Sequence, residues 1–191
     1  MSGTEHLQKD QRTIERVTRA CRVFAEMLQN GTSVPAGVLQ SVVKFLRVFC
    51  HDYYGEQEDW LFAMLQTKGF PFEGFPIESL RHEHDRLALL TNQLGNSVDV
   101  YSLNHEDMAK TRLISTLRAL AELYSDHVWK ENYVLLPIAE ELFSAADQRV
   151  LADKLQMVEV AMGADARLVV EQLRDNIRQC PECNQQESHA A

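Results

Sequence analysis

The sequence predicts an all-α fold, an antiparallel up-down-up-down four-helix bundle with a C-terminal helical extension. Along four long segments, apolar residues recur three and four positions apart, the spacing that gathers side chains on one face of a helix. The 191 residues include only eight glycines and five prolines, too few for a fold with many tight turns. Long amphipathic helices with short connections pack most simply as a bundle.

The first helix is expected over about residues 4–29. Ser2 or Thr4 would cap its start, because a side-chain oxygen there can accept a free backbone N–H, and Asn30-Gly31 would end it. Gln11 is the one polar residue in its apolar stripe.

The second helix is expected over about residues 35–67. Its apolar face carries Tyr54 and Glu58, with His51 at the edge of that face. Gly55 costs a helix about 1 kcal/mol relative to alanine. It therefore indicates either the close approach of another backbone or a local irregularity.

The third helix is expected over about residues 77–94, after a loop at 68–76 that is rich in glycine, proline and phenylalanine. His84 falls in its apolar stripe, whereas Glu83 is expected to face water. Gly95 would end this helix, and a loop would follow up to residue 104.

The fourth helix is expected over about residues 105–142, with His105 at its start. His127 and Glu131 lie four residues apart on its apolar face, where aliphatic side chains would be expected. Pro137 predicts a kink in the helix about one turn after Glu131.

The chain then divides into three units. The bundle occupies residues 1–145, and an appended helical pair over 146–179 is expected to pack on or beside it. The pair consists of amphipathic segments at about 147–162 and 164–177. Residues 180–191 are expected to form a flexible tail.

Four cysteines, Cys21, Cys50, Cys180 and Cys183, are expected to be reduced. The first two fall on apolar stripes and suit a core. The last two form a CxxC half-site with three open interpretations: a zinc site shared across a homodimer, a redox-active thiol pair, or a tail without function, which we favour.

Charge and hydropathy exclude some partners. The net charge is −9, and the acidic residues are scattered, which argues against nucleic acid and against a polybasic membrane contact. Residues 1–20 are polar, and no apolar run approaches the roughly 20 residues of a membrane span. We therefore expect a cytoplasmic protein whose partners are cations, small molecules or proteins.

In a bundle the polar residues of the apolar stripes converge. A buried polar group without a partner costs at least about 1–3 kcal/mol. A metal ion, mutual pairing or polar groups on facing helices must therefore satisfy these residues. Imidazole and carboxylate donors suit iron, manganese and zinc, and bundle metal sites form between facing helices. The candidate metal ligands are His51, Tyr54, Glu58, His84, His127 and Glu131, with Gln11 as a hydrogen-bond partner of a ligand.

Over about residues 4–145 the chain resembles the hemerythrin-like, or HHE cation-binding, proteins. The matching stretches are 13–17, 58–62, 83–86 and 127–137, and the last resembles the closing signature of the family. The resemblance implies a non-haem di-iron site in an antiparallel bundle. It also implies roles such as oxygen binding, oxygen or redox sensing, iron handling, and reactions with peroxide or nitric oxide.

Two positions depart from that family pattern. Gln11 stands where the family has its first-helix histidine, and Tyr54 stands where the family has a histidine four residues before Glu58. A tyrosine phenolate is a hard oxygen donor that suits ferric iron, so Tyr54 is a candidate substitute ligand. His51 is the other candidate replacement.

Three functions stay open on this basis. The leading one is a metal-binding protein whose buried iron site, with one or two ions, binds or senses oxygen, peroxide or nitric oxide. The second is a non-haem iron enzyme that activates oxygen or peroxide at an open coordination position. The third is a degenerate bundle that acts as a protein-interaction module.

Overall fold

The computed structural model describes residues 2–104, 107–180 and 183, and every regular element within these ranges is a helix. The predicted all-α bundle with a C-terminal extension is therefore confirmed. His105, expected at the start of the fourth helix, lies outside the described residues.

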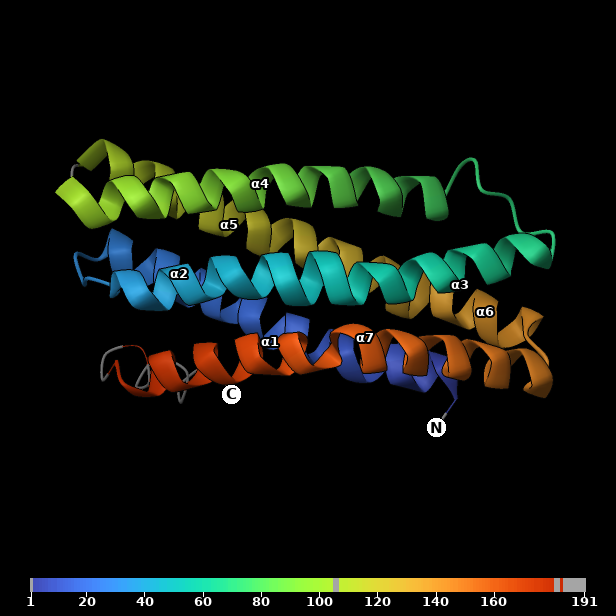
Figure 1. Cartoon of the computed structure of the whole chain (residues 1–191). Coiled ribbons are helices and arrows are strands. Elements are labelled where there is room, and N and C mark those ends of the chain that lie inside the picture. The colour runs from blue at the N-terminus through green and yellow to red at the C-terminus, as the bar shows by residue number, and fades with distance from the viewer. Residues whose placement is uncertain (1, 105–106, 181–182, 184–191) are drawn as a thin grey trace.

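Four long helices form the bundle, and successive helices run in opposite directions (Figure 1). The second and fourth each contain a π-helical segment, written η. The bundle consists of α1 (Gly3–Gln29); the second helix, continuous through α2 (Ala36–Phe45), η1 (Leu46–Tyr54) and α3 (Gly55–Thr67); α4 (Ile77–Asn104); and the fourth helix, α5 (Asp107–Lys130), η2 (Glu131–Leu135) and α6 (Leu136–Leu142).

Helix α1 begins with a reciprocal cap. The Glu5 backbone N–H donates to Ser2 Oγ at 3.2 Å, and the Ser2 backbone N–H donates to Glu5 Oε2 at 2.7 Å. Two backbone donors that the first turn leaves free are thus satisfied. Of the two residues proposed as the cap, Ser2 is the one that takes this role.

Gly55, the unexpected glycine of the second helix, lies next to the π-helical segment η1. A side chain added at Gly55 would meet nothing nearer than the Cys50 carbonyl oxygen, at 3.7 Å, so no other element approaches this glycine closely. Gly55 instead follows directly on the last residue of η1. Of the two interpretations of Gly55, the local irregularity is the one that the structure supports.

The expected end of the third helix at Gly95 is wrong, because α4 continues through it to Asn104. A Cβ atom at Gly95 would lie 3.0 Å from Arg47 Nη2, whose guanidinium also donates to Asn92 Oδ1 at 3.2 Å. Gly95 therefore leaves room for an arginine from the neighbouring helix. It does not end α4.

The expected helical pair is also wrong, since α7 (Ala145–Arg178) is a single helix of 34 residues. Gly163, which lies between the two expected segments, is buried within α7, and the Glu159 carboxylate folds over it. Arg167 and Tyr53 both bond that carboxylate. Space for the Glu159 side chain is thus a reason for a glycine in the middle of a helix.

Helix α7 lies against α1 and against the second helix (Figure 1). Gly3, at the start of α1, has no room for a side chain because Leu151 of α7 occupies the space. The core is one continuous set of apolar side chains that includes residues of α7. None of the described helices has both the length and the apolar character to cross a membrane.

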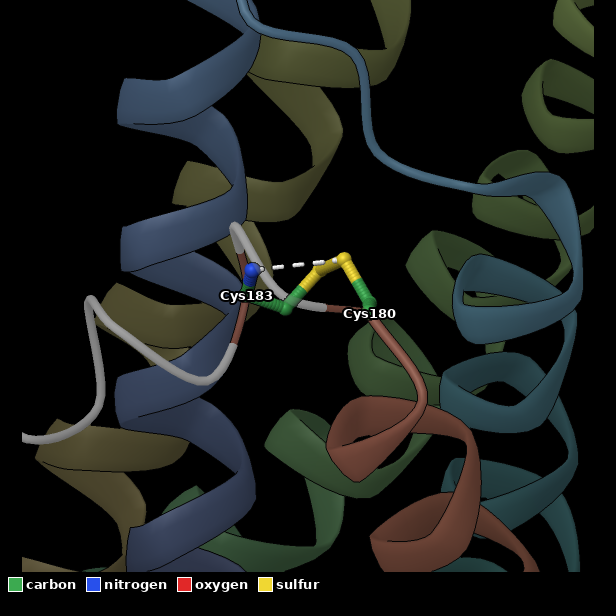
Figure 2. Close-up of a disulfide and its surroundings, with 2 residues drawn as sticks. All are labelled: Cys180 and Cys183. Carbon is green, nitrogen blue, oxygen red and sulfur yellow. Dashed lines mark hydrogen bonds between the residues drawn. A yellow bond between two sulfur atoms is a disulfide. The ribbon is translucent and has the colours of Figure 1, made fainter.

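Cys180 and Cys183 form a disulfide, which Figure 2 shows at the end of α7. The expectation that all four cysteines are reduced is therefore wrong for this pair. Both residues are buried and do not lie in an exposed tail. Cys21 and Cys50 are free thiols in the core, as expected.

Candidate metal centre

Three helices bring one carboxylate and two imidazoles together in the interior. Glu58 lies in the first turn of α3, His84 in α4, and His127 in the last turn of α5. Glu58 Oε2 is 3.2 Å from His84 Nε2, and Glu58 Oε1 is 3.4 Å from His127 Nε2. One potential ligand atom from each residue lies within 4.8 Å of the others. The helical stripes of the sequence therefore place these three side chains at one point.

The chemistry of this cluster fits a cation. Donors about 2.1 Å from a metal ion in tetrahedral or octahedral geometry lie roughly 3.0–3.4 Å from one another, and the Glu58 contacts have this spacing. Glu58 Oε1 and His84 Nε2 are both buried and make no well-formed hydrogen bond within the described residues. Buried polar atoms are normally satisfied by a hydrogen bond or by a bound ion, and a cation would satisfy these two.

Glu131, the first residue of η2, lies beside the three ligand candidates. Its Oε1 is 3.8 Å from His127 Nε2. Its Oε2 accepts hydrogen bonds from Gln11 Nε2 at 2.9 Å and from the Tyr54 hydroxyl at 3.2 Å. Tyr54 and Gln11 thus contact the same carboxylate oxygen, and both are almost fully buried.

His51 is not brought to the cluster. Its side chain is exposed on η1, whereas Tyr54 at the end of the same segment is buried. Hydrogen bonds in a π-helix join residues five apart, so each turn holds more residues than an α-turn. The prediction that His51 lies at the edge of the inward face assumed the α-helical angle between successive residues. That angle is smaller in a π-helix, so His51 and Tyr54 are separated differently around the helix axis.

Glu83 does not simply face water, as the sequence suggested. Its Oε2 lies 3.0 Å from His127 Nδ1, and its other oxygen contacts Lys130. A hydrogen bond from Nδ1–H to a carboxylate leaves the Nε2 lone pair of the imidazole free for a metal and fixes the ring orientation. The one available signal in the sequence was its position next to His84.

The pKa values of the two buried carboxyl groups, Glu58 and Glu131, are shifted in opposite directions. Burial raises the pKa of Glu131, and the neighbouring Glu58 carboxylate raises it further, well above the ordinary value. Burial acts on Glu58 in the same direction, but the charge of His84 and the nearby Glu131 and His127 side chains outweigh it and hold the pKa of Glu58 well below the ordinary value.

The surroundings of His127 favour its protonated form. Burial lowers its pKa, but the charge of Glu131 and the hydrogen bonds to Glu58 and Glu83 raise it to about 10. The pKa of the Tyr54 hydroxyl is raised by burial and by the charges of Glu131 and Glu58. A cation bound among these groups would take the place of protons, which is the usual coupling between metal binding and ionisation.

A cleft of about 720 Å³ reaches the cluster from the side of α4 and η1. The His84 side chain is 24% exposed, whereas those of Glu58 and His127 are only 2% and 4% exposed. The cluster therefore opens to the cleft at His84. The other walls of the cleft include Cys50, Leu87, Thr91 and Tyr124, with Arg47, His51 and Asp59 also lining it.

Comparison with known proteins gives one family. The sequence profile of the hemerythrin HHE cation-binding domain matches residues 2–139. Among curated proteins, the chain is 22% identical over 157 residues to the uncharacterized proteins Rv1995 of Mycobacterium tuberculosis and Mb2018 of Mycobacterium bovis. The match covers 82% of this chain but only 60% of those relatives. No solved structure matches the chain significantly.

Proposed function

We propose a function from the premise that this chain belongs to the hemerythrin HHE cation-binding family: it is a non-haem iron protein whose buried site binds or senses a small oxidant. The convergence of Glu58, His84 and His127 on one point carries the proposal. The family binds cations, and the cluster offers the nitrogen and oxygen donors that iron accepts.

The number of ions depends on Glu131 and Tyr54. One ion is supported by Glu58, His84 and His127 alone, since their ligand atoms already share one small volume. A second ion would need Glu131, with Tyr54 as a phenolate donor. The contact between these two side chains supports that role but is equally satisfied by a neutral hydroxyl that donates to a carboxylate. Manganese and zinc remain compatible with the same donors.

A small oxidant such as oxygen, peroxide or nitric oxide would reach the site through the cleft beside His84. Iron held there would supply a Lewis acid and a one-electron redox centre. The chain would supply hydrogen-bond donors, the Gln11 amide and the Tyr54 hydroxyl, on the Glu131 side of the site. The apolar walls at Leu87 and Tyr124 would limit the water that competes for the centre.

An enzyme is the second candidate, and the cleft favours it. Gln11 and Tyr54 both contact Glu131 Oε2, and neither is among the three residues that share one point. A metal ion held by only three protein ligands keeps coordination positions for a substrate. Consumption of peroxide by the iron-loaded protein would favour turnover over binding.

A cytoplasmic location and a homodimer also stay predictions.

The first test is iron content after expression in iron-replete medium and purification without chelators. We expect iron at a stoichiometric level, and its loss in His84→Ala. His82→Ala is the matched control, because His82 is an exposed histidine two residues away on the same helix. A wild-type protein that carries only traces of metal would favour the third alternative, a bundle used for protein interaction.

The second test concerns Tyr54. If Tyr54 binds ferric iron, the oxidised protein has a visible phenolate-to-iron charge-transfer band that is absent in Tyr54→Phe. Tyr53→Phe is the matched control, because the neighbouring Tyr53 hydroxyl donates instead to Glu159 Oε2 at 2.7 Å. An unchanged band in Tyr54→Phe would leave Tyr54 as a hydrogen-bond donor to Glu131 only.

A further inference from the structure

A second, smaller pocket lies between α1 and α7, and it shares no lining residue with the cleft at the candidate metal centre. Its volume is about 230 Å³. That is the space of roughly eight water molecules at ~30 Å³ each. The pocket therefore suits a compact ligand and not a polymer.

Three arginines line this pocket: Arg16 from α1, and Arg174 and Arg178 from α7. Among the described residues no acidic one lines it, although the whole chain carries a net charge of −9. Positive charge is thus concentrated at this point against the average of the molecule. An anion would be attracted here and repelled by most of the surrounding surface.

The three arginines have no acidic partner in the part of the chain that the structure describes. Within the described residues, Arg174 and Arg178 make no ion pair or side-chain hydrogen bond, and Arg16 bonds only Thr13 Oγ1, at 3.2 Å. Arg174 and Arg178 are also four residues apart on one helix, an arrangement that costs about 0.2–0.5 kcal/mol for like charges. The helix dipole favours Arg178 in the last turn of α7, but it does not remove the repulsion between the two arginines, which a bound anion would offset.

The remaining lining is apolar apart from Thr13. Ala20, Leu173 and Ile177 are buried residues of the α1–α7 contact, and Val170 is half-buried beside them. The pocket thus combines an apolar wall with guanidinium groups that hold carboxylate or phosphate oxygens in pairs. A bare inorganic ion would leave the apolar wall without a contact.

We propose that this pocket binds a small amphipathic organic anion, with its acidic group between the arginines and its apolar body against Leu173 and Val170. The site is independent of iron. A compact aromatic or branched carboxylate matches both its volume and its chemistry.

Benzoate is the probe, and benzamide, which has nearly the same shape without the charge, is its matched control. Binding to the full-length protein is measured by isothermal titration and by chemical-shift changes of the backbone amides that line the pocket. We expect benzoate to bind and to be displaced by salt, and benzamide and inorganic phosphate to bind more weakly. Equal binding of benzamide, or of phosphate alone, would overturn the proposal.

The double variant Arg174→Gln, Arg178→Gln tests the location. We expect about tenfold weaker benzoate binding, the effect of losing two exposed charge contacts. The control, Arg86→Gln with Arg112→Gln, removes the same charge from exposed sites on α4 and α5 and should bind as the wild type does. Because Arg174 and Arg178 are exposed, folding should survive their replacement. Unchanged affinity in the Arg174→Gln, Arg178→Gln protein would refute the site.

Discussion

Replacing Glu83 should weaken metal binding although Glu83 is not one of the three convergent residues. The Glu83 carboxylate lies 3.0 Å from His127 Nδ1 and so fixes which imidazole nitrogen faces the candidate metal. Loss of such a supporting hydrogen bond typically costs 10- to 100-fold in metal affinity, about 1.4–2.7 kcal/mol. The side chain is 13% exposed, and Lys130 already offsets part of its charge. We therefore expect about a tenfold loss in Glu83→Ala, at the low end of that range.

Glu83→Gln should lose less, since its amide oxygen can still accept the proton of Nδ1–H while the negative charge is gone. Affinity is measured by competition with a chromophoric chelator, with Fe²⁺ under anaerobic conditions and with Zn²⁺ in air. Asp85→Asn is the control, because Asp85 is an exposed acid two residues along the same helix. Equal affinities of Glu83→Ala and the wild type, in proteins of equal thermal stability, would refute the orientation of His127 deduced from the geometry.

Three further predictions concern stability and thiol chemistry. The pKa of Asp147 is lowered to about 2, chiefly by the hydrogen bond from Lys68. A lowered pKa stabilises the fold above the ordinary value of 3.8 and loses that effect as pH falls toward 2. Acid unfolding of Asp147→Asn, followed by circular dichroism, should therefore differ less from wild type at pH 2 than at pH 5. Burial raises the pKa of Cys21 to about 12 and also raises that of Cys50. The Cys21 thiol, which does not line the cleft at the candidate metal centre, should not react with a disulfide reagent until the protein unfolds, as followed by the absorbance of the released thiolate. Binding of a metal at 100 times its Kd should add about 2.7 kcal/mol to the free energy of unfolding, a rise of roughly 5–10 °C in Tm for a domain of this size. A Tm that no iron, manganese or zinc salt shifts would contradict the metal site.

The sequence could predict which residues of the candidate site face inward, because helical periodicity does not depend on where the helix ends. Glu58, His84, His127 and Glu131 each interrupt an apolar stripe, and the structure groups all four, three of them within one set of ligand distances. Periodicity gives the face of a helix on which a residue lies. The partner that the residue meets there depends on the neighbouring helix, which is why the role of Glu83 was missed.

Helix ends were harder to predict, and the errors share one cause. The third helix was expected to end at Gly95 and the C-terminal extension to divide near residue 163. Gly95 and Gly163 each lie instead inside a helix, where another side chain needs the space, that of Arg47 at the first and that of Glu159 at the second. A glycine signals only that a side chain is absent. Whether the absence serves a turn or a close contact depends on residues far away in the sequence or a full turn along the helix.

The two π-helical segments connect the irregular parts of the fold to the candidate site. Segment η1 ends at Tyr54 and η2 begins at Glu131, and these two residues meet through the 3.2 Å hydrogen bond from the Tyr54 hydroxyl. A π-turn hydrogen-bonds less well than an α-turn, and in proteins such turns occur frequently at functional sites. Apolar packing alone would not require this irregularity in two facing helices at the same level of the bundle. Its coincidence with the buried polar cluster indicates that the irregular backbone serves to bring Tyr54 and Glu131 together beside Glu58 and His127.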